Sequence, residues 1–379
     1  MKFGQIITCS RCVMDTTDSA ITFDKRGVCD HCRGFDLSVS KKWNNDGRER
    51  HRLGEIVDSV RRSGNGRDFD CILGLSGGLD SSYMLHLLVT EFNLRPLVFH
   101  VDGGWNSSLA VSNIQLMVEK LNLDLFTEVI DWEDMRDLQL AFFKSGIAQI
   151  DIPQDHAFIS TLYKFADKYG IKYIMNGGNL ATECVRNPLE WLYYGTDMRL
   201  INDIRRRFCK RPLDNYPFSS VFFHKLYLRY IKGVHVLKPL NYLHYTKKIA
   251  IETLTKEYGW TTYPQKHFES RFTKFFEGYW LPSRFGYDTR KVQFSSLILT
   301  EQMTRDEALD ALKRPAYKNE DIEADLAYIS RKLGVTIDEL RFYHSMPLKS
   351  YRDYCNQEMG FNIGAKLLRV IGVENSIKR

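Results

Sequence analysis

The sequence predicts an α/β protein with a doubly wound parallel sheet, a cysteine ribbon before the sheet and a mainly helical region after it. Short apolar segments that are typical of buried strands alternate with segments of helical periodicity. Two closely spaced pairs of cysteines precede the first of these strands. Two helix-capping patterns follow the last strand, where no further strand is expected.

Composition narrows the class of protein. The chain has 379 residues, of which 44% are apolar, so it can form a large core. Its net charge of +6 suits phosphate-bearing ligands but is too small to indicate nucleic-acid binding, so no nucleic-acid partner is expected. No apolar run reaches the roughly 18 residues of a membrane-spanning helix, and no signal-like segment is visible. We therefore expect a cytoplasmic protein whose eight cysteines are thiols or metal ligands.

The two cysteine pairs predict a structural zinc site. Cys9 and Cys12 form one Cys-x-x-Cys pair, Cys29 and Cys32 the other, with about 16 residues between them. Four thiolates complete a tetrahedral site for Zn²⁺ and leave no open position for catalysis. The alternative is four unrelated thiols. His31 lies inside the second pair but is surplus to four ligands, and we expect it at the surface.

A glycine loop follows the first strand, which is predicted over residues 68–75. The loop is Ser76-Gly77-Gly78-Leu79-Asp80-Ser81-Ser82, and a helix is predicted after it over 83–88. Glycines allow a tight turn and a close approach to phosphate, and the N–H groups of the helix start face the anion. The loop lacks the lysine of a Walker A motif. The alternative is a structural turn of the same composition.

The loop resembles the Ser-Gly-Gly-x-Asp-Ser signature of the PP-loop ATP pyrophosphatases, and the resemblance spans roughly residues 67–240. It implies that ATP binds with Mg²⁺ and that AMP is transferred to a substrate oxygen. The residues that it implies for the phosphates leaving as pyrophosphate are Ser76, Gly77, Gly78, Asp80, Ser81 and Ser82.

Polar residues follow two further predicted strands. The strand over 96–101 ends in Asp102, and the strand over 173–176 ends in Asn176 before Gly178 and Asn179. Ligands gather at the carboxyl ends of parallel strands, so these residues together favour a site. The resemblance to the PP-loop enzymes implies that this is the adenosine side. Each alone is equally an ordinary turn former. A helix capped by Ser107 or Ser108 and a closing strand over 233–237 complete the predicted sheet layer.

Residues 185–232 depart from this alternation. A basic run, Arg205-Arg206-Arg207, precedes an aromatic stretch over 222–230. The first interpretation is a solvated face and a packing helix. The second is a docking surface for a partner subunit or a membrane face.

The C-terminal half carries the closest resemblance. Its segments His-Phe-Glu-Ser-Arg-Phe-Thr-Lys (267–274) and Phe-Gly-Tyr-Asp-Thr-Arg-Lys (285–291), taken with the ribbon and the loop, resemble the N-acetyl sugar amidotransferase family of bacterial surface-polysaccharide biosynthesis. The resemblance covers nearly the whole chain. It implies that ATP and ammonia convert the acetamido group of a nucleotide-linked sugar into an acetamidino group. It also implies separate glutaminase and cyclase-like subunits that supply ammonia, and a homo-oligomer is possible.

Charged residues in these segments are the candidates for chemistry. Basic side chains stabilise transferring phosphoryl groups, and carboxylates orient substrates or act as bases. The alternative for each basic residue is a surface charge. The catalytic candidates are Asp80, Glu269, Arg271, Lys274 and Lys291, with Arg290, Asp155 and His156 beside them.

Two other functions remain open. A tRNA thiolation enzyme shares the loop and often a ribbon, but needs reactive cysteines near the nucleotide, for which Cys184 is the candidate. A non-catalytic zinc-ribbon scaffold would need a degenerate loop. The predicted domains are a zinc ribbon (1–40), a helical linker (41–66), the α/β ATP-binding domain (67–240) and a mainly helical region that completes the active site (241–379).

Overall fold

The computed structural model describes residues 5–41, 43 and 49–370, and within these ranges the chain forms one five-stranded parallel sheet. The strand order is β3-β2-β1-β4-β5. All four neighbouring pairs are parallel, with β1 in the centre between β2 and β4. The strands are β1 (Cys71–Gly74), β2 (Pro96–Asp102), β3 (Leu125–Val129), β4 (Tyr173–Met175) and β5 (His235–Leu237).

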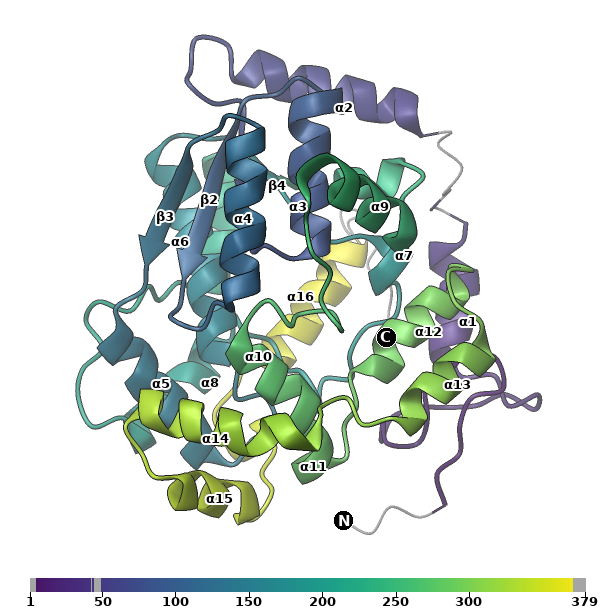
Figure 1. Cartoon of the computed structure of the whole chain (residues 1–379), viewed down its shortest axis with the longest axis vertical. Helices are drawn as coiled ribbons and strands as arrows, with labels where there is room; N and C mark the ends of the chain where they lie inside the picture. The colour runs from purple at the N-terminus through teal and green to yellow at the C-terminus, as the bar shows by residue number, and fades with distance from the viewer. Residues whose placement is uncertain (1–4, 42, 44–48, 371–379) are drawn as a thin grey trace.

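Helices cover both faces of the sheet, which confirms the doubly wound prediction. Leu73 of β1 packs in one core with Leu85 of α3 (Leu79–His86) and Ile114 of α4 (Ser108–Lys120). Its neighbour Ile72 points to the opposite face and packs in another core that contains Ala166 of α6 (Ile152–Lys168). Figure 1 shows α3 and α4 in front of the strands and α6 behind them.

The edge strand β3 was missed in the sequence. Its sequence, Leu-Phe-Thr-Glu-Val, has only two adjacent apolar residues, and its last three residues are exposed. The other strands were predicted within three residues of their observed bounds, and α4 close to its own. The helix predicted over 83–88 is wrong at its start, because α3 begins at Leu79, inside the predicted loop. Ser107 is the residue that caps α4, through a hydrogen bond from Ala110 N.

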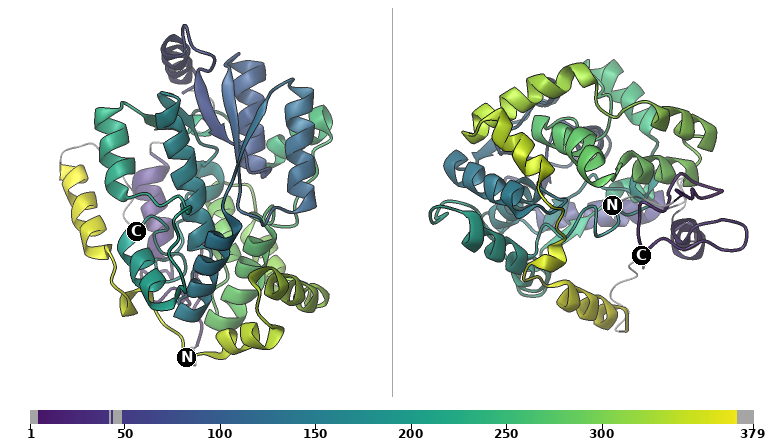
Figure 2. Two further views of the ribbon diagram at one scale, coloured as in Figure 1. Left: turned by 90° about the vertical axis from the view of Figure 1, so that its left-hand side faces the viewer. Right: turned by 90° about the horizontal axis from the view of Figure 1, so that it is seen from below.

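The C-terminal helices form a second core below the sheet. Phe143 of α5 (Trp132–Ser145) packs there with Phe272, Trp280 and Leu326. Figure 1 and the left view of Figure 2 both place these helices at the end of the molecule opposite the helix α2 (Arg50–Ser63). The elements of this core are α10 (Arg271–Phe275), η5 (Phe276–Trp280), α11 (Leu281–Phe285), α14 (Asn319–Leu333) and α15 (Ile337–Ser345). The helix α12 (Arg290–Leu299) instead packs in the core of the ribbon cysteines and the sheet, and α13 (Arg305–Lys313) follows it beside the ribbon.

Both predicted capping boxes are present, with Thr304 and Glu307 at α13 and Thr336 and Glu339 at α15. The remaining described elements are short or lie at the edges. They are α1 (Asp30–Gly34), η1 (Phe35–Val39), η2 (Leu87–Glu91), α7 (Leu180–Glu183), α8 (Met198–Phe208), η3 (Phe223–Ile231), η4 (Pro239–Tyr242), α9 (Lys247–Tyr258), η6 (Tyr351–Asp353) and α16 (Glu358–Val370).

The four predicted domains pack into one another. The core beneath the ribbon cysteines includes Leu73 of the sheet, and the core around Phe143 is shared with the C-terminal helices. Because the predicted domains share their cores, the structure does not separate them, and the domain boundaries remain predictions. Residues 1–4 of the predicted ribbon, 42 and 44–48 of the predicted linker and 371–379 of the predicted C-terminal region lie outside the described residues. Among the described residues, no helix combines the length and apolarity that a membrane crossing requires.

Candidate functional site

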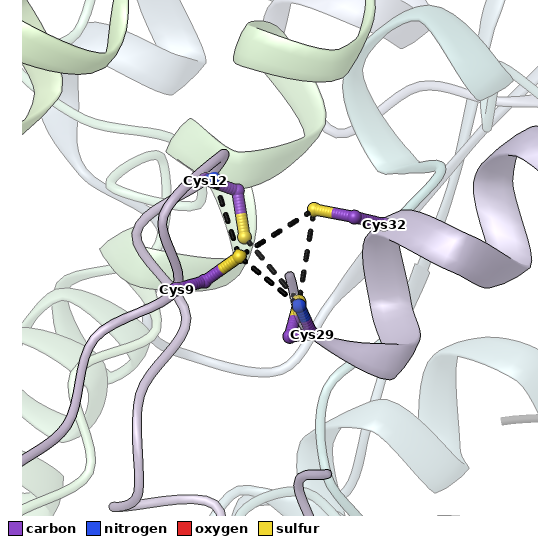
Figure 3. Close-up of side chains that lie close together, drawn as sticks. All are labelled: Cys9, Cys12, Cys29 and Cys32. Atoms are coloured by element: carbon purple, nitrogen blue, oxygen red, sulfur yellow. Dashed lines mark hydrogen bonds between the residues drawn. The ribbon is translucent and has the colours of Figure 1, made fainter. Parts of the chain in front are cut away.

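The four ribbon cysteines meet at one point, as Figure 3 shows. Their Sγ atoms all lie within 4.8 Å of one another, and the Cys12–Cys29 and Cys29–Cys32 separations are 3.6 Å. Four sulfurs around Zn²⁺ at about 2.3 Å form a tetrahedron with edges of roughly 3.8 Å. All four side chains are fully buried. The cluster therefore fits a closed, structural zinc site.

Polar contacts fix the ribbon to the C-terminal region. Arg305 donates from Nη2 to Cys9 O at 2.9 Å and from Nε to Cys12 O at 3.1 Å. Lys291, predicted to stabilise charge in the active site, instead pairs with Asp15 of the ribbon at 2.5 Å. The prediction that His31 lies at the surface is wrong. Its side chain is 6% exposed and lies 3.0 Å from an Asp18 oxygen, so it helps to hold the ribbon.

The glycine loop has the tight backbone that its sequence predicts. Gly77 has φ +80°, and a Cβ there would lie 2.8 Å from the Ala110 carbonyl oxygen. A Cβ at Gly78 would lie 2.7 Å from an oxygen of Glu269. The hydroxyls of Ser76 and Ser81 are 3.2 Å apart across the turn. Side chains at these glycines would displace the turn or fill the space beside it.

The loop opens into a cavity of about 1020 Å³. Seven Lys or Arg and four Asp or Glu side chains line it, so its wall is net positive. An anionic ligand of several charges suits such a wall. The basic residues are Lys238, Lys247, Lys266, Lys274, Arg290, Arg314 and Lys318.

Asp80 is the centre of a polar network in this cavity. Lys266 lies 3.0 Å from Asp80 and 2.7 Å from Glu183. The Tyr245 hydroxyl donates a hydrogen bond to the Asp80 carboxylate, and the Asn179 side-chain amide donates another at 3.2 Å. Burial raises the pKa of Asp80, but the charge of Lys266 and the bond from Tyr245 outweigh it, so the pKa lies below its usual value. Asp80 is therefore ionised and neutralised by Lys266.

A short bridge brings the C-terminal half to the loop. Asn106 pairs with Ser270 in an antiparallel β-bridge, and Ser107 N donates to Glu269 O at 2.9 Å. This contact sets the Glu269 carboxylate opposite Gly78. Burial raises the pKa of Glu269 although the charge of His267 opposes the shift. A carboxyl group that is easier to protonate therefore lies beside the loop.

Of the predicted adenosine-side residues, Asn176 and Gly178 line the cavity, whereas Asp102 and Asn179 do not. Asp102 accepts from Gly104 N at 2.7 Å and from Asn106 at 3.1 Å, so it orders the turn after β2. Asn176 accepts from Gly178 N at 2.7 Å, and both residues line the cavity. Asn179 caps α7 and positions Asp80. Ser82 is fully buried in α3 and does not line the cavity.

The predicted cations divide into two groups. Lys274 lines the cavity and pairs with Asp321 at 3.2 Å, and Arg290 reaches it while paired with Asp288. Arg271 does not line this cavity; it pairs with Asp325 at 2.6 Å beside a smaller one. Arg271 and Lys291 therefore lie outside the group of side chains that face the loop.

The surroundings of three further predicted residues, His156, Asp155 and Cys184, indicate which of them can take part in chemistry. His156 uses both ring nitrogens, donating to Gly195 O at 2.8 Å and accepting from Ser219 N at 3.1 Å, so it has no nitrogen left for a base. Burial raises the pKa of Asp155 to about 6. Burial also raises the pKa of Cys184 to about 11, and its thiol donates to Ser296 O at 3.7 Å. A reactive thiolate is not favoured there.

Sequence reasoning missed the cation that contacts Asp80. Lys266 stands directly before the segment 267–274, and a search of that segment's flanks would have found it. Tyr245, Lys238 and Lys247 were also missed. No motif marks them, because they reach the cavity through the connection between β5 and α9.

Residues 269–368 match the family model described as "LPS biosynthesis protein WbpG-like, C-terminal domain". This region is similar to the C-terminal domain of WbpG-like proteins. The match includes Glu269 and Lys274, so the segment opposite the loop belongs to the part of the chain shared with LPS biosynthesis proteins. It supports the resemblance stated above over that region.

The chain is also similar to the uncharacterized protein MJ1599 of Methanocaldococcus jannaschii. The two are 26% identical over 176 residues, which is 45% of this chain and 59% of that protein. The chain thus spans less than two thirds of the length of this curated relative.

The solved structures to which the chain is similar include two NAD synthetases. The NH3-dependent NAD synthetase of Campylobacter jejuni has 13% identity and a TM-score of 0.32, over 79% of this chain and 98% of that one. The NAD+ synthetase of Burkholderia pseudomallei has 16% identity and a TM-score of 0.30, over 61% of this chain and 95% of that one. At these scores the fold assignment stands on the strand order and the loop position described above.

Proposed function

We propose that this chain is an ATP-dependent amidotransferase, forming AMP and pyrophosphate. It acts on the acetamido group of a nucleotide-linked N-acetyl sugar and gives an acetamidino sugar for LPS, O-antigen or related glycan biosynthesis. One observation carries the proposal. The Ser-Gly-Gly-Leu-Asp-Ser loop and the WbpG-like segment line the same net positive cavity. We place this reaction in the cytoplasm.

The loop and Lys266 hold the phosphates of ATP in this proposal. Backbone N–H groups at the start of α3 face the anion, and Lys238 and Lys247 add positive charge from the facing wall. Mg²⁺, when bound, neutralises charge on the departing pyrophosphate. Asp80 and Glu183 are the oxygen donors that fit it, and both pair with Lys266 in this structure. If these two carboxylates held Mg²⁺, Lys266 would be free to contact phosphate.

The chemistry has two steps. The acetamido oxygen attacks the α-phosphorus, the bond to pyrophosphate breaks, and an O-adenylyl imidate forms. Ammonia then adds to the imidate carbon and AMP leaves with the C–O bond electrons, so that the oxygen is replaced by nitrogen. Glu269 is positioned to accept the proton that ammonia loses, because it faces the loop and its pKa is raised by burial.

Ammonia comes from elsewhere in this proposal. The sequence has no glutaminase signature, so we propose separate glutaminase and cyclase-like subunits as the source. A thiolation function is disfavoured because Cys184 is buried with a raised pKa.

The test is a direct assay of the products. The purified chain is incubated with ATP, Mg²⁺, an ammonium salt and a panel of UDP-N-acetyl sugars. We expect AMP and pyrophosphate in equal amounts, and mass spectrometry should show one sugar in which O is replaced by NH. Formation of ADP and phosphate, or AMP formation that no N-acetyl sugar stimulates, would contradict the proposal.

A further inference from the structure

The surface beside β5 combines exposed apolar tips with positive charge. Residues 215–251 contain no Asp or Glu and six Lys or Arg. Within this stretch η3 buries only His224 and Leu228. The other side chains of η3 are exposed or only partly buried.

The exposed residues of η3 follow its helical repeat. Phe222, Leu226 and Tyr230 recur every four residues, and their exposed fractions are 63%, 47% and 59%. Ile231 beside them is 71% exposed. Lys225 and Arg229 are also exposed and alternate with the apolar positions. The outer face is therefore both apolar and basic along its whole length.

The end of α6 continues this face. Lys172 donates to Lys232 O at 2.6 Å, and Ala166 packs in one core with Leu228, so the two elements adjoin. Tyr169 at this end is 48% exposed, with the ammonium of Lys168 5.4 Å from its ring centroid. The acidic Asp167 is paired with Lys232 at 3.4 Å.

We propose that this outer face, formed by residues 222, 225, 226, 229–231, 168 and 169, docks the protein on an anionic membrane surface. Interfacial helices insert apolar tips into the headgroup boundary while Lys and Arg contact lipid phosphates. Charge complementarity selects this occupant, since the stretch 215–251 has no carboxylate that anionic lipid would repel. Aliphatic tips such as Leu226 and Ile231 do not stack on bases, which disfavours nucleic acid.

The test is sedimentation of the full chain with vesicles. We expect binding to phosphatidylglycerol–phosphatidylcholine vesicles that weakens at high salt, and little binding to phosphatidylcholine alone. K225Q/R229Q should weaken binding about 25-fold, because each basic residue at an anionic surface contributes roughly fivefold. F222S/I231S should weaken it by about tenfold or more through loss of the apolar tips.

Two control variants remove the same kinds of side chain, exposed basic and exposed apolar, from surfaces away from η3. K25Q/R26Q removes two exposed charges from the ribbon, and V129S removes a 69% exposed apolar side chain from β3, at the opposite edge of the sheet. Both should bind vesicles like the parent chain. Absence of vesicle binding by the parent, or equal loss in controls and test variants, overturns the proposal. A dimer that F222S/I231S dissociates, without vesicle binding, would assign the face to a second copy instead.

Discussion

The cysteine ribbon and the loop cavity both gather reactive groups, but they do so in opposite ways. The four ribbon sulfurs are fully buried and already at metal-ligand separation from one another. The Asp80–Lys266 pair is 18% and 23% exposed and borders about 1020 Å³ of open space. A closed cluster stabilises a fold, whereas an open one admits a reactant. The buried cluster therefore has a structural role and the open cluster a chemical one, and four experiments test this distinction.

The largest effect is expected at the ribbon. Cys32→Ser should remove the metal and unfold the ribbon, because bound zinc supplies on the order of 10 kcal/mol to such small modules. Metal content and hydrogen exchange over residues 5–41 measure this effect. Cys355→Ser is the matched control: Cys355 is exposed and lies far from the cluster in sequence, so the metal should stay. Full metal content in Cys32→Ser would contradict a four-cysteine site.

Asp80→Ala tests the open cluster. Loss of the carboxylate should lower pyrophosphate formation by at least about 100-fold, the scale of a removed transition-state contact. The control Asp321→Ala removes a cavity carboxylate paired with Lys274 and should cost far less. Adding Lys266→Met to Asp80→Ala should recover part of the thermal stability but not activity, since it removes a cation that has lost one of its two carboxylate partners. Parent-like activity of Asp80→Ala would discard the assignment.

His267 predicts a smaller, pH-dependent effect. Burial lowers its pKa, but the charge of Glu277 outweighs this and raises the pKa from 6.5 to about 9. The stabilisation is therefore complete below pH 6.5 and is lost as pH rises through 9. The ring is 40% exposed, so we expect at most about 1 kcal/mol. Asn tolerates the left-handed φ of +67° at this position, so His267→Asn should not strain the backbone. The variant's free energy of unfolding, measured by urea titration, should depend less on pH between 6.5 and 9 than that of the parent.

Cys184→Ser should have the smallest effect. A serine hydroxyl can still donate to Ser296 O, so pyrophosphate formation should stay close to that of the parent. A loss of activity with unchanged stability would favour thiolation chemistry over amidation.

The fold and the open site were predictable to different degrees. Apolar runs such as 71–74 identified the central strands, whereas β3 was missed because its exposed half carries no apolar run. The loop was found because adjacent glycines in a short segment indicate a tight turn without any information on distant contacts. The roles of Lys266 and Asp18 were not found in the sequence. Each residue acts through a contact, Lys266 with Asp80 and Asp18 with His31, that forms only when the chain folds. Lys291 has the expected charge but a partner in the ribbon.

The bridge between Asn106 and Ser270 has a consequence for how the protein is made. Synthesis produces the glycine loop early and the residues opposite it late, up to Lys318 and Asp321 of the cavity wall. A chain still on the ribosome therefore holds Asp80 without Lys266 or Glu269. The cavity wall is therefore complete only after residues 266–321 have been synthesised and have folded against the loop.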